Sequence, residues 1–156
     1  MPEDGIEEQL ASYKVDSDGV PARVDIVRRE EEYVPIYDVT RPRVDEATQA
    51  LLTDVKEDMT AKVRLSTKEF VDPSELNKVK QKFRDTAKEL LDEELPSLDD
   101  RAQQVVIGNM IHEMLGLGDI EVLLDDENLE EIVVNGAKEP AWVYHKSHGW
   151  LKTSVM

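Results

Sequence analysis

Two histidines near the C-terminal end of the sequence have a spacing that some metal sites use. His145 and His148 stand three residues apart across a predicted hairpin turn. A zinc site needs three or four ligands, and the sequence places no third one nearby. His112 and Glu113, in IHEML, lack the second histidine of a zinc-protease helix. Two solvated histidines beside a turn are the simpler interpretation, and we predict no metal site.

Carboxylates are the other abundant reactive groups. Adjacent pairs include Asp99-Asp100, Asp125-Asp126 and Glu130-Glu131. Acid–base catalysis needs two carboxyl groups in different environments of one pocket, and the sequence marks no such pocket. The segment DSDG, residues 16–19, matches half of a calcium loop without its later ligands. Because the chain has no cysteine and no serine in a nucleophile elbow, we predict no catalytic residue.

The clustered glycines are Gly116 and Gly118, in Gly-Leu-Gly. Neither a GK[ST] sequence after them nor a buried strand before them supports a phosphate-binding loop, so no cofactor-binding residue is predicted. Gly116 instead stands where a helix ends in the left-handed conformation. We therefore predict that Gly116 and Gly118 form a hinge between a helical segment and a sheet.

Three aromatic residues form the remaining constellation. Trp142 and Tyr144 are two apart on a predicted strand, so they share a face, and Trp150 can join them across the hairpin. Platforms that stack nucleic-acid bases use such groups in basic grooves, but this region is acidic. We predict that the three residues pack in a domain core or against a neighbouring domain.

The charge of the chain limits its partners. Thirty-five acidic residues against 19 basic ones give a net charge of −16. A chain this acidic repels both nucleic acid and anionic lipid surfaces, so neither is a predicted partner. Two interpretations of the acidity stay open. One is solubility or adaptation to a salty or hot cytosol, and the other is docking onto the Lys/Arg-rich cytoplasmic loops of a membrane protein.

The N-terminal sequence MPEDGIEEQL begins acidic, unlike a signal peptide. The chain has no apolar run of membrane-spanning length, so no direct membrane insertion is expected. Residues 1 to about 20 show no sustained period and predict a flexible leader. Alternation from Ala22 predicts a strand, and Pro35 limits the next segment to an edge strand or extended arm. Residues 1–43 are thus predicted to be a flexible acidic leader and extended arm.

Helical periods follow over residues 44–116. Three apolar stripes at spacings of three and four are separated by the capping segment FVDPSEL and by Pro96 with SLDD. Because no stripe can be buried alone, the sequence predicts a three-helix bundle over residues 44–116. Residues 117–156 then predict a short helix and an antiparallel meander. Three strands need further partners, so this segment is expected to be the start of a truncated αβ domain and the fold class to be α+β.

The order GLGDIEVLLDDENLEEIVVNG, then WVYH, then GWL, resembles the segment that opens the N-terminal domain of secretion-superfamily ATPases. These are the hexameric motors of type II and type IV secretion, type IV pili and the archaeal flagellum. Three features are most similar to the archaeal branch: the inserted AKEP, the form WVYHKSHGWLKT and the preceding EYVPIYDV. The resemblance is strong over residues 116–152, moderate over 31–115 and negligible before residue 20.

The resemblance implies the N-terminal, non-catalytic region of such a motor. Its implied partners are the motor's own ATPase domain, neighbouring subunits and a membrane-embedded platform protein. The implied location is cytoplasmic, held peripherally to the inner face of the cell membrane through protein partners. This chain has no Walker A loop and no Walker B acid, so ATP and magnesium belong to the implied parent and not to this fragment.

Two alternatives to the motor stay open at this point. One is a stand-alone helical adaptor or scaffold without an ATPase parent, and it requires this chain alone to close the sheet. The other is a small hydrolase that uses carboxylates or the histidine pair. The resemblance does not distinguish a parent for secretion from one for a pilus or a flagellum.

Overall fold

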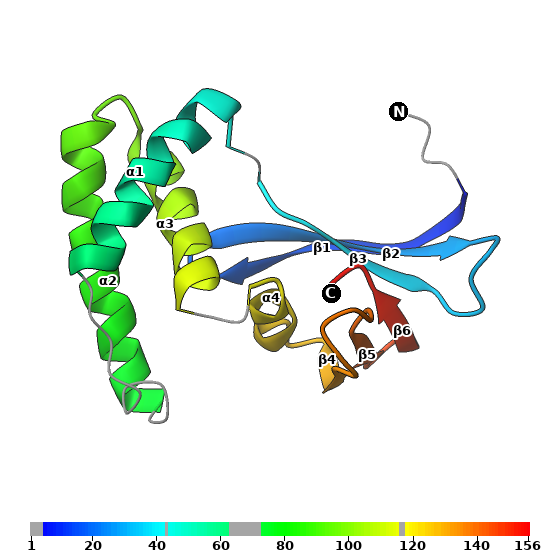
Figure 1. Ribbon diagram of the computed structural model, residues 1–156. Coiled ribbons are helices and arrows are strands. Elements are labelled where there is room, and N and C mark those ends of the chain that lie inside the picture. The colour runs from blue at the N-terminus through cyan, green and yellow to red at the C-terminus, as the bar shows by residue number, and fades with distance from the viewer. Residues whose placement is uncertain (1–4, 43, 63–72, 116–117) are drawn as a thin grey trace. The chain divides into compact units, whose positions relative to one another are not determined.

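The computed structural model describes residues 5–42, 44–62, 73–115 and 118–156, and it describes only the backbone of residues 62 and 73–76 (Figure 1). The chain forms two compact units. The sheet unit comprises Met1–Pro42 and Leu117–Met156, and the helical unit comprises Arg43–Gly116. The helical unit is therefore inserted, along the sequence, between two parts of the sheet unit.

Six strands form one mixed sheet in the sheet unit (Figure 1). They are β1 (Ile6–Ser17), β2 (Val20–Arg29), β3 (Ile36–Thr40), β4 (Leu129–Val133), β5 (Trp142–His145) and β6 (Gly149–Thr153), in the spatial order β1-β2-β3-β6-β5-β4. Neighbouring strands are antiparallel except β3 and β6, where Ile36 lies opposite Lys152 and Tyr37 opposite Thr153 in a parallel pair. This pair joins the strands that precede the helical unit to those that follow it.

β1 and β2 form the longest hairpin of the sheet. Asp18 and Gly19 at its turn have φ angles of 52° and 85°. Positive φ at both central residues is the geometry that Asp-Gly favours in a tight hairpin turn. The amide of Gly19 also donates to Oδ1 of Asp16 at 3.1 Å. The DSDG segment therefore builds a turn.

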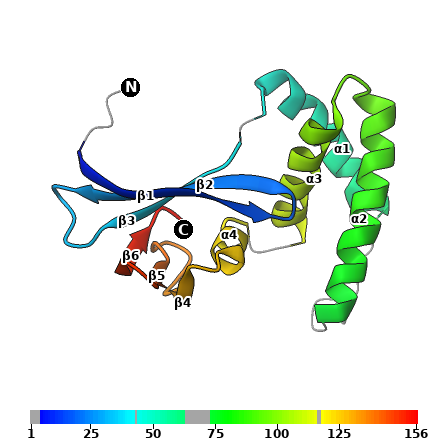
Figure 2. The same cartoon turned by 180° about the vertical axis from the view of Figure 1, so that it is seen from behind.

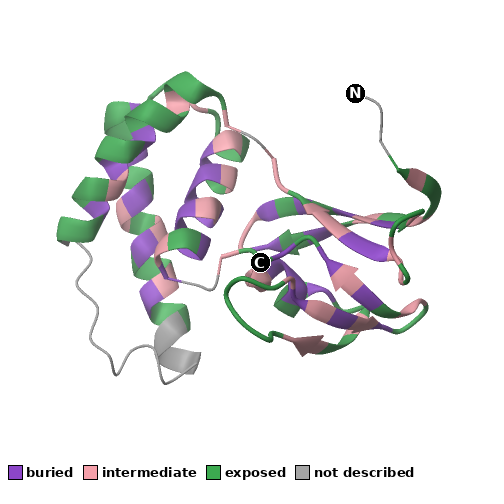
Figure 3. Ribbon diagram, turned by 45° about the vertical axis from the view of Figure 1, so that its right-hand side comes forward, coloured by how far each residue is buried: buried purple, intermediate pink, exposed green. Residues whose placement is uncertain are grey.

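The core of the sheet unit lies on one face of the sheet, where the short helix α4 (Ile120–Asp125) packs near the β1–β2 turn, as Figure 2 shows from behind. Buried residues alternate with more exposed ones along β2 from Val20 to Ile26 and with half-buried ones along β5 (Figure 3), because successive side chains point to opposite faces. The buried members of this core are Val15, Ala22, Val24, Ile26, Tyr37, Val122, Leu123, Ala141, Val143, Leu151 and Val155. Strands from both ends of the chain thus share one core.

The helical unit consists of α1 (Glu46–Lys62), α2 (Pro73–Glu94) and α3 (Asp100–Met114). One apolar stripe of each helix meets in a single core, which includes Val55, Phe83 and Met110. Asp99 caps α3, since its side chain accepts from the amide of Ala102 at 2.7 Å. The expected cap in FVDPSEL, Asp72, lies outside the described residues. In the part of the chain that is described, no helix is both long enough and apolar enough to span a membrane.

The predicted fold class is wrong. An extended N-terminal arm, a three-helix bundle and the opening of an αβ domain do not describe this chain, because residues before the helices form half of a six-stranded sheet. The expectation that the C-terminal meander lacks partner strands fails for the same reason. β6 has a partner strand in β3, and the amide of Ser154 donates to the carbonyl of Tyr37 at 3.0 Å.

Two local features explain the error. Residues 6–17 form β1, although a flexible leader was expected here. The strand was not predicted because register shifts at Ile6/Glu8 and at Gln9/Ala11 break the alternation that marks a strand. Pro35 precedes β3, so its missing donor removes no hydrogen bond from the ladder. Its carbonyl still accepts from the amide of Lys152 at 3.3 Å, and β3 is an interior strand instead of an edge.

Candidate functional site

A buried carboxylate that accepts four hydrogen bonds belongs to Asp126, the residue that follows α4. It is 5% exposed. Its Oδ2 accepts from the hydroxyls of Tyr13 and Tyr37, each at 2.6 Å. Its Oδ1 accepts from the backbone amide of Asn128 at 2.9 Å and from that residue's side-chain amide at 3.1 Å. Asp126 therefore ties β1, β3 and the α4–β4 turn to one another.

The two tyrosines of this network act as hydrogen-bond donors. Burial, then the hydrogen bond to Asp126 and its charge, raise the pKa of Tyr13 well above its usual value. The same causes raise the pKa of Tyr37. Both phenols therefore stay protonated at physiological pH, and neither is an activated nucleophile. All four donors to Asp126 come from the chain itself, so this arrangement serves to hold elements together.

His145 lies beside this network and is buried, contrary to the expected solvated histidine. Its Nε2 is 3.3 Å from the hydroxyl oxygen of Tyr13, and its Nδ1 accepts from the amide of Ser147 at 3.0 Å. The ring centroid of His148 lies 4.9 Å from that of His145. The two histidines are thus close together, but both nitrogens of His145 already face partners within the chain.

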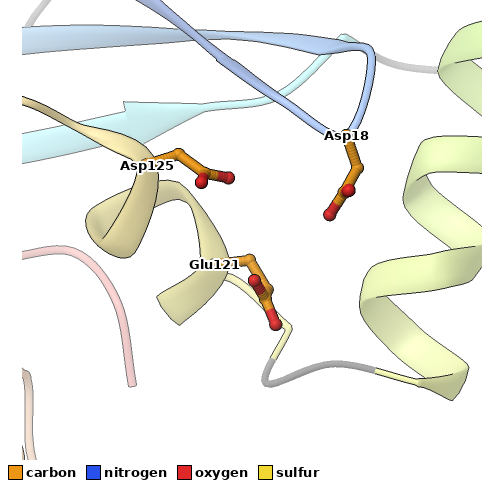
Figure 4. Close-up of side chains that lie close together, drawn as sticks. All are labelled: Asp18, Glu121 and Asp125. Atoms are coloured by element: carbon orange, nitrogen blue, oxygen red, sulfur yellow. The ribbon is translucent and has the colours of Figure 1, made fainter. Parts of the chain in front are cut away.

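A cluster of three carboxylates lies at the β1–β2 turn (Figure 4). Asp18 comes from the turn, while Glu121 and Asp125 come from α4, and one ligand atom of each lies within 4.8 Å of the others. The hydroxyl of Ser17 donates to Asp125. Carboxylate oxygens suit calcium and magnesium, but each of these ions takes six or more ligands in all. Since partly exposed acidic groups often lie together without an ion, we assign no metal to this cluster.

Sequence reasoning considered DSDG and Asp125-Asp126 separately and missed that they meet. Glu121 and Asp125 are four residues apart, which places them on one face of α4. The available signal for Asp18 was Asp-Gly, which predicts a tight turn at the end of a hairpin. Nothing local in the sequence indicates that the β1–β2 turn lies beside α4.

The aromatic group predicted from sequence lies away from the sheet core. Trp142 and Tyr144 are half-buried, and they alternate with the buried residues of β5. Trp150 is 43% exposed and meets Tyr144 edge to face, with ring centroids 5.4 Å apart. The three residues therefore project from the sheet face opposite the core. Their packing against a neighbouring domain stays a prediction.

Of the predicted hinge glycines, Gly116 lies outside the described residues. Gly118 has a φ of 62°, and a β-carbon at this position would meet no neighbouring atom. Arg41 donates to the carbonyl of Gly118 at 3.1 Å and forms an ion pair with Asp119. The segment that leaves β3 is thus tied to the segment that enters α4, and the hinge itself stays a prediction.

Comparison with known proteins gives two relatives from Methanocaldococcus jannaschii, and both are uncharacterized. MJ1288 is 32% identical over 85 residues, which are 54% of this chain and 34% of that protein. MJ0781 is 27% identical over 150 residues, which are 94% of this chain and 19% of that protein. No family model matches the chain. The chain therefore aligns with about a third of one relative and about a fifth of the other.

Proposed function

We propose that this chain is the N-terminal, non-catalytic region of a hexameric secretion-superfamily ATPase. Such a motor powers protein secretion or the assembly of a pilus or archaeal flagellum. In this proposal the region contacts the membrane-embedded platform protein and couples it to the ATP-driven motion of the ring. ATP and magnesium bind to the ATPase domain of the parent, and the region itself lies in the cytoplasm at the inner face of the membrane.

The ordered motif over residues 116–152 carries this proposal. It combines unlike parts in sequence, namely G-x-G, a leucine pair, an acidic turn, E-I-x-V-N-G, an aromatic strand and G-x-L. Two features of the relatives support it. Both come from an archaeon, which agrees with the archaeal character of the motif, and MJ0781 is several times longer than the 150 residues it shares with this chain.

The helical unit offers an acidic surface for a basic platform loop. Partial loss of hydration, a hydrogen bond with Asp58 and the charges of Asp58, Asp54 and Glu93 all raise the pKa of Glu94. Crowded carboxylates of this kind repel one another, so a basic partner relieves a repulsion in addition to forming ion pairs. This surface of α1 and α2, the carboxylate surface, consists of Asp54, Asp58, Glu93 and Glu94.

Docking is testable with peptides that cover the cytoplasmic loops of the platform protein from the same cell. We expect the full chain to bind a basic loop peptide at ~30 mM salt and to bind it at least tenfold more weakly at ~300 mM. The triple variant Asp54→Asn, Asp58→Asn, Glu94→Gln should lose this binding. The matched control neutralises three exposed acids of the sheet unit, Glu127→Gln, Glu130→Gln and Glu139→Gln, and should retain it. Absence of binding at low salt defeats the docking step.

The parent is tested independently of docking, by the natural reading frame downstream of codon 156. A GxxxxGK[ST] loop in the next few hundred codons supports the motor. A frame without one removes the proposed ATPase parent, whatever the peptides bind.

One observation favours the alternative, a stand-alone adaptor or scaffold without an ATPase parent. That alternative required this chain to close the sheet by itself, and β1–β3 do join β4–β6. Because β4–β6 have partner strands in this chain, both functions expect these strands to be protected against hydrogen exchange, and that measurement does not distinguish them. The reading frame is consequently the observation that distinguishes them.

A further inference from the structure

His145 joins the buried network to the connection between β5 and β6. Its Nδ1 accepts from the amide of Ser147 at 3.0 Å, so Nδ1 carries no proton in this arrangement. The proton of the neutral ring is then on Nε2, which lies 3.3 Å from the hydroxyl oxygen of Tyr13. That oxygen can accept from Nε2, because the hydroxyl proton is directed to Asp126 at 2.6 Å. The hydrogen bonds therefore run in one direction, from His145 through Tyr13 to Asp126.

The same geometry conflicts with a doubly protonated ring. An imidazolium carries N–H groups on both nitrogens, so Nδ1–H would face the amide N–H of Ser147, donor against donor. His148 lies 4.9 Å away, centroid to centroid, and repels a second positive charge when both rings are protonated. Asp126 acts in the opposite direction, since its negative charge attracts the imidazolium through Tyr13.

The surroundings of His145 contain few other groups that titrate. Tyr13 faces His145 from β1, and His148 faces it from the β5–β6 connection. Asp126 of the α4–β4 turn lies beyond Tyr13, and Tyr37 of β3 donates to the same carboxylate. Its partner on β4 is Leu129, which carries no charge.

We propose that His145 is a pH-sensitive hydrogen-bond acceptor that fixes the β5–β6 connection. Neutral His145 holds the connection at Ser147, and protonation releases Ser147 and His148, while the amide of Lys146 stays bonded to the carbonyl of Asn128 at 2.9 Å and the strands stay paired. The direction of its titration agrees with this geometry. Burial, followed by the charge of His148, lowers the pKa of His145, and Asp126 opposes them only in part. This role of His145 is independent of the proposed motor function, because it uses only contacts within the sheet unit.

The experiment is amide hydrogen exchange by NMR on the full chain from about pH 7.5 to about pH 5, with protection factors corrected for intrinsic rates. The protection of Ser147 should fall about tenfold per pH unit below about pH 6.5, until the lower pKa of the closed state is reached. The amide of Ala141, which donates to the carbonyl of Val155 at 2.8 Å, serves as an internal reference and should stay protected. Ring nitrogen shifts of His145 at neutral pH should show the Nε2–H tautomer.

Two variants separate the histidines. His148→Gln should keep the loss of protection and move it to higher pH, because the positive charge of His148 no longer lowers the pKa of His145. His145→Asn places an amide oxygen near the position of Nδ1 and should give protection that does not vary with pH. Should this variant fail to fold, the titration of the His148→Gln chain decides alone. Protection that is flat through the His145 titration, protection that follows His148, or an Nδ1–H tautomer overturns the proposal.

Discussion

At the scale of single residues, Asp126 joins parts of the chain that the sequence keeps far apart. Its tyrosine partners are 113 and 89 positions away. Sequence patterns report neighbours within a few turns or along one strand, so no spacing rule identifies this carboxylate among so many acids. A buried carboxylate that accepts four hydrogen bonds holds its surroundings firmly, whereas loss of one partner leaves buried polar groups unsatisfied.

Replacing Asp126 should therefore lower the free energy of unfolding far more than replacing its neighbour. For Asp126→Asn we expect a loss of about 2–4 kcal/mol, because the amide has one acceptor oxygen where the carboxylate has two, so either the two tyrosine hydroxyls or the two amides of Asn128 lose their acceptor. Glu127→Gln is the matched control, since this acid is adjacent but exposed, and it should change stability by less than about 0.5 kcal/mol. Urea unfolding followed by circular dichroism measures both. Equal losses from the two variants would show that the network contributes no special stability.

At the scale of elements, the β1–β2 hairpin shows where sequence reasoning succeeds and where it fails. The alternation of Val24 and Ile26 correctly predicts a strand, because β2 has no bulge. The sequence pattern does not predict β1, because its two register shifts move inward-facing residues out of alternation. The Asp-Gly signal was present but was compared with a calcium loop. The carboxylate cluster and the Asp126 network were missed with it, since both depend on β1 lying in the sheet.

The hairpin turn gives a prediction at this scale. Gly19→Ala should destabilise the sheet unit by about 1 kcal/mol, because its φ of 85° lies in the region that L-residues avoid. Gly136→Ala is the matched control. A β-carbon there meets no atom within 4 Å, and the backbone has no positive φ, so stability should stay the same or rise slightly. Thermal unfolding of the two variants and the parent chain provides the comparison, and an equal effect of both substitutions would contradict the turn geometry.

At the scale of the whole molecule, the sheet unit depends on contacts between the two ends of the chain. The ladder between β3 and β6 is short, with Ile36 opposite Lys152 and Tyr37 opposite Thr153. The ion pair between Lys152 and Glu32 and the hydrogen bond from the amide of Val39 to the hydroxyl of Ser154 add to it. The helical unit, by contrast, has its own core from α1, α2 and α3. The two units should therefore respond differently to loss of the N-terminal strands.

A chain that begins at Val44 tests this dependence directly. It keeps the whole core of the helical unit but lacks β1–β3, which supply Val15, Ala22, Val24, Ile26 and Tyr37 to the other core. Burial of a large apolar side chain contributes about 1.5–3 kcal/mol, so the remaining three strands cannot stay folded without these residues. Hydrogen exchange should show that amides of β4–β6 lose their protection, while those of α3 in the same sample keep it. If the C-terminal strands stay protected in the shortened chain, residues 6–40 are an appendage and the six-stranded sheet is not the unit that folds.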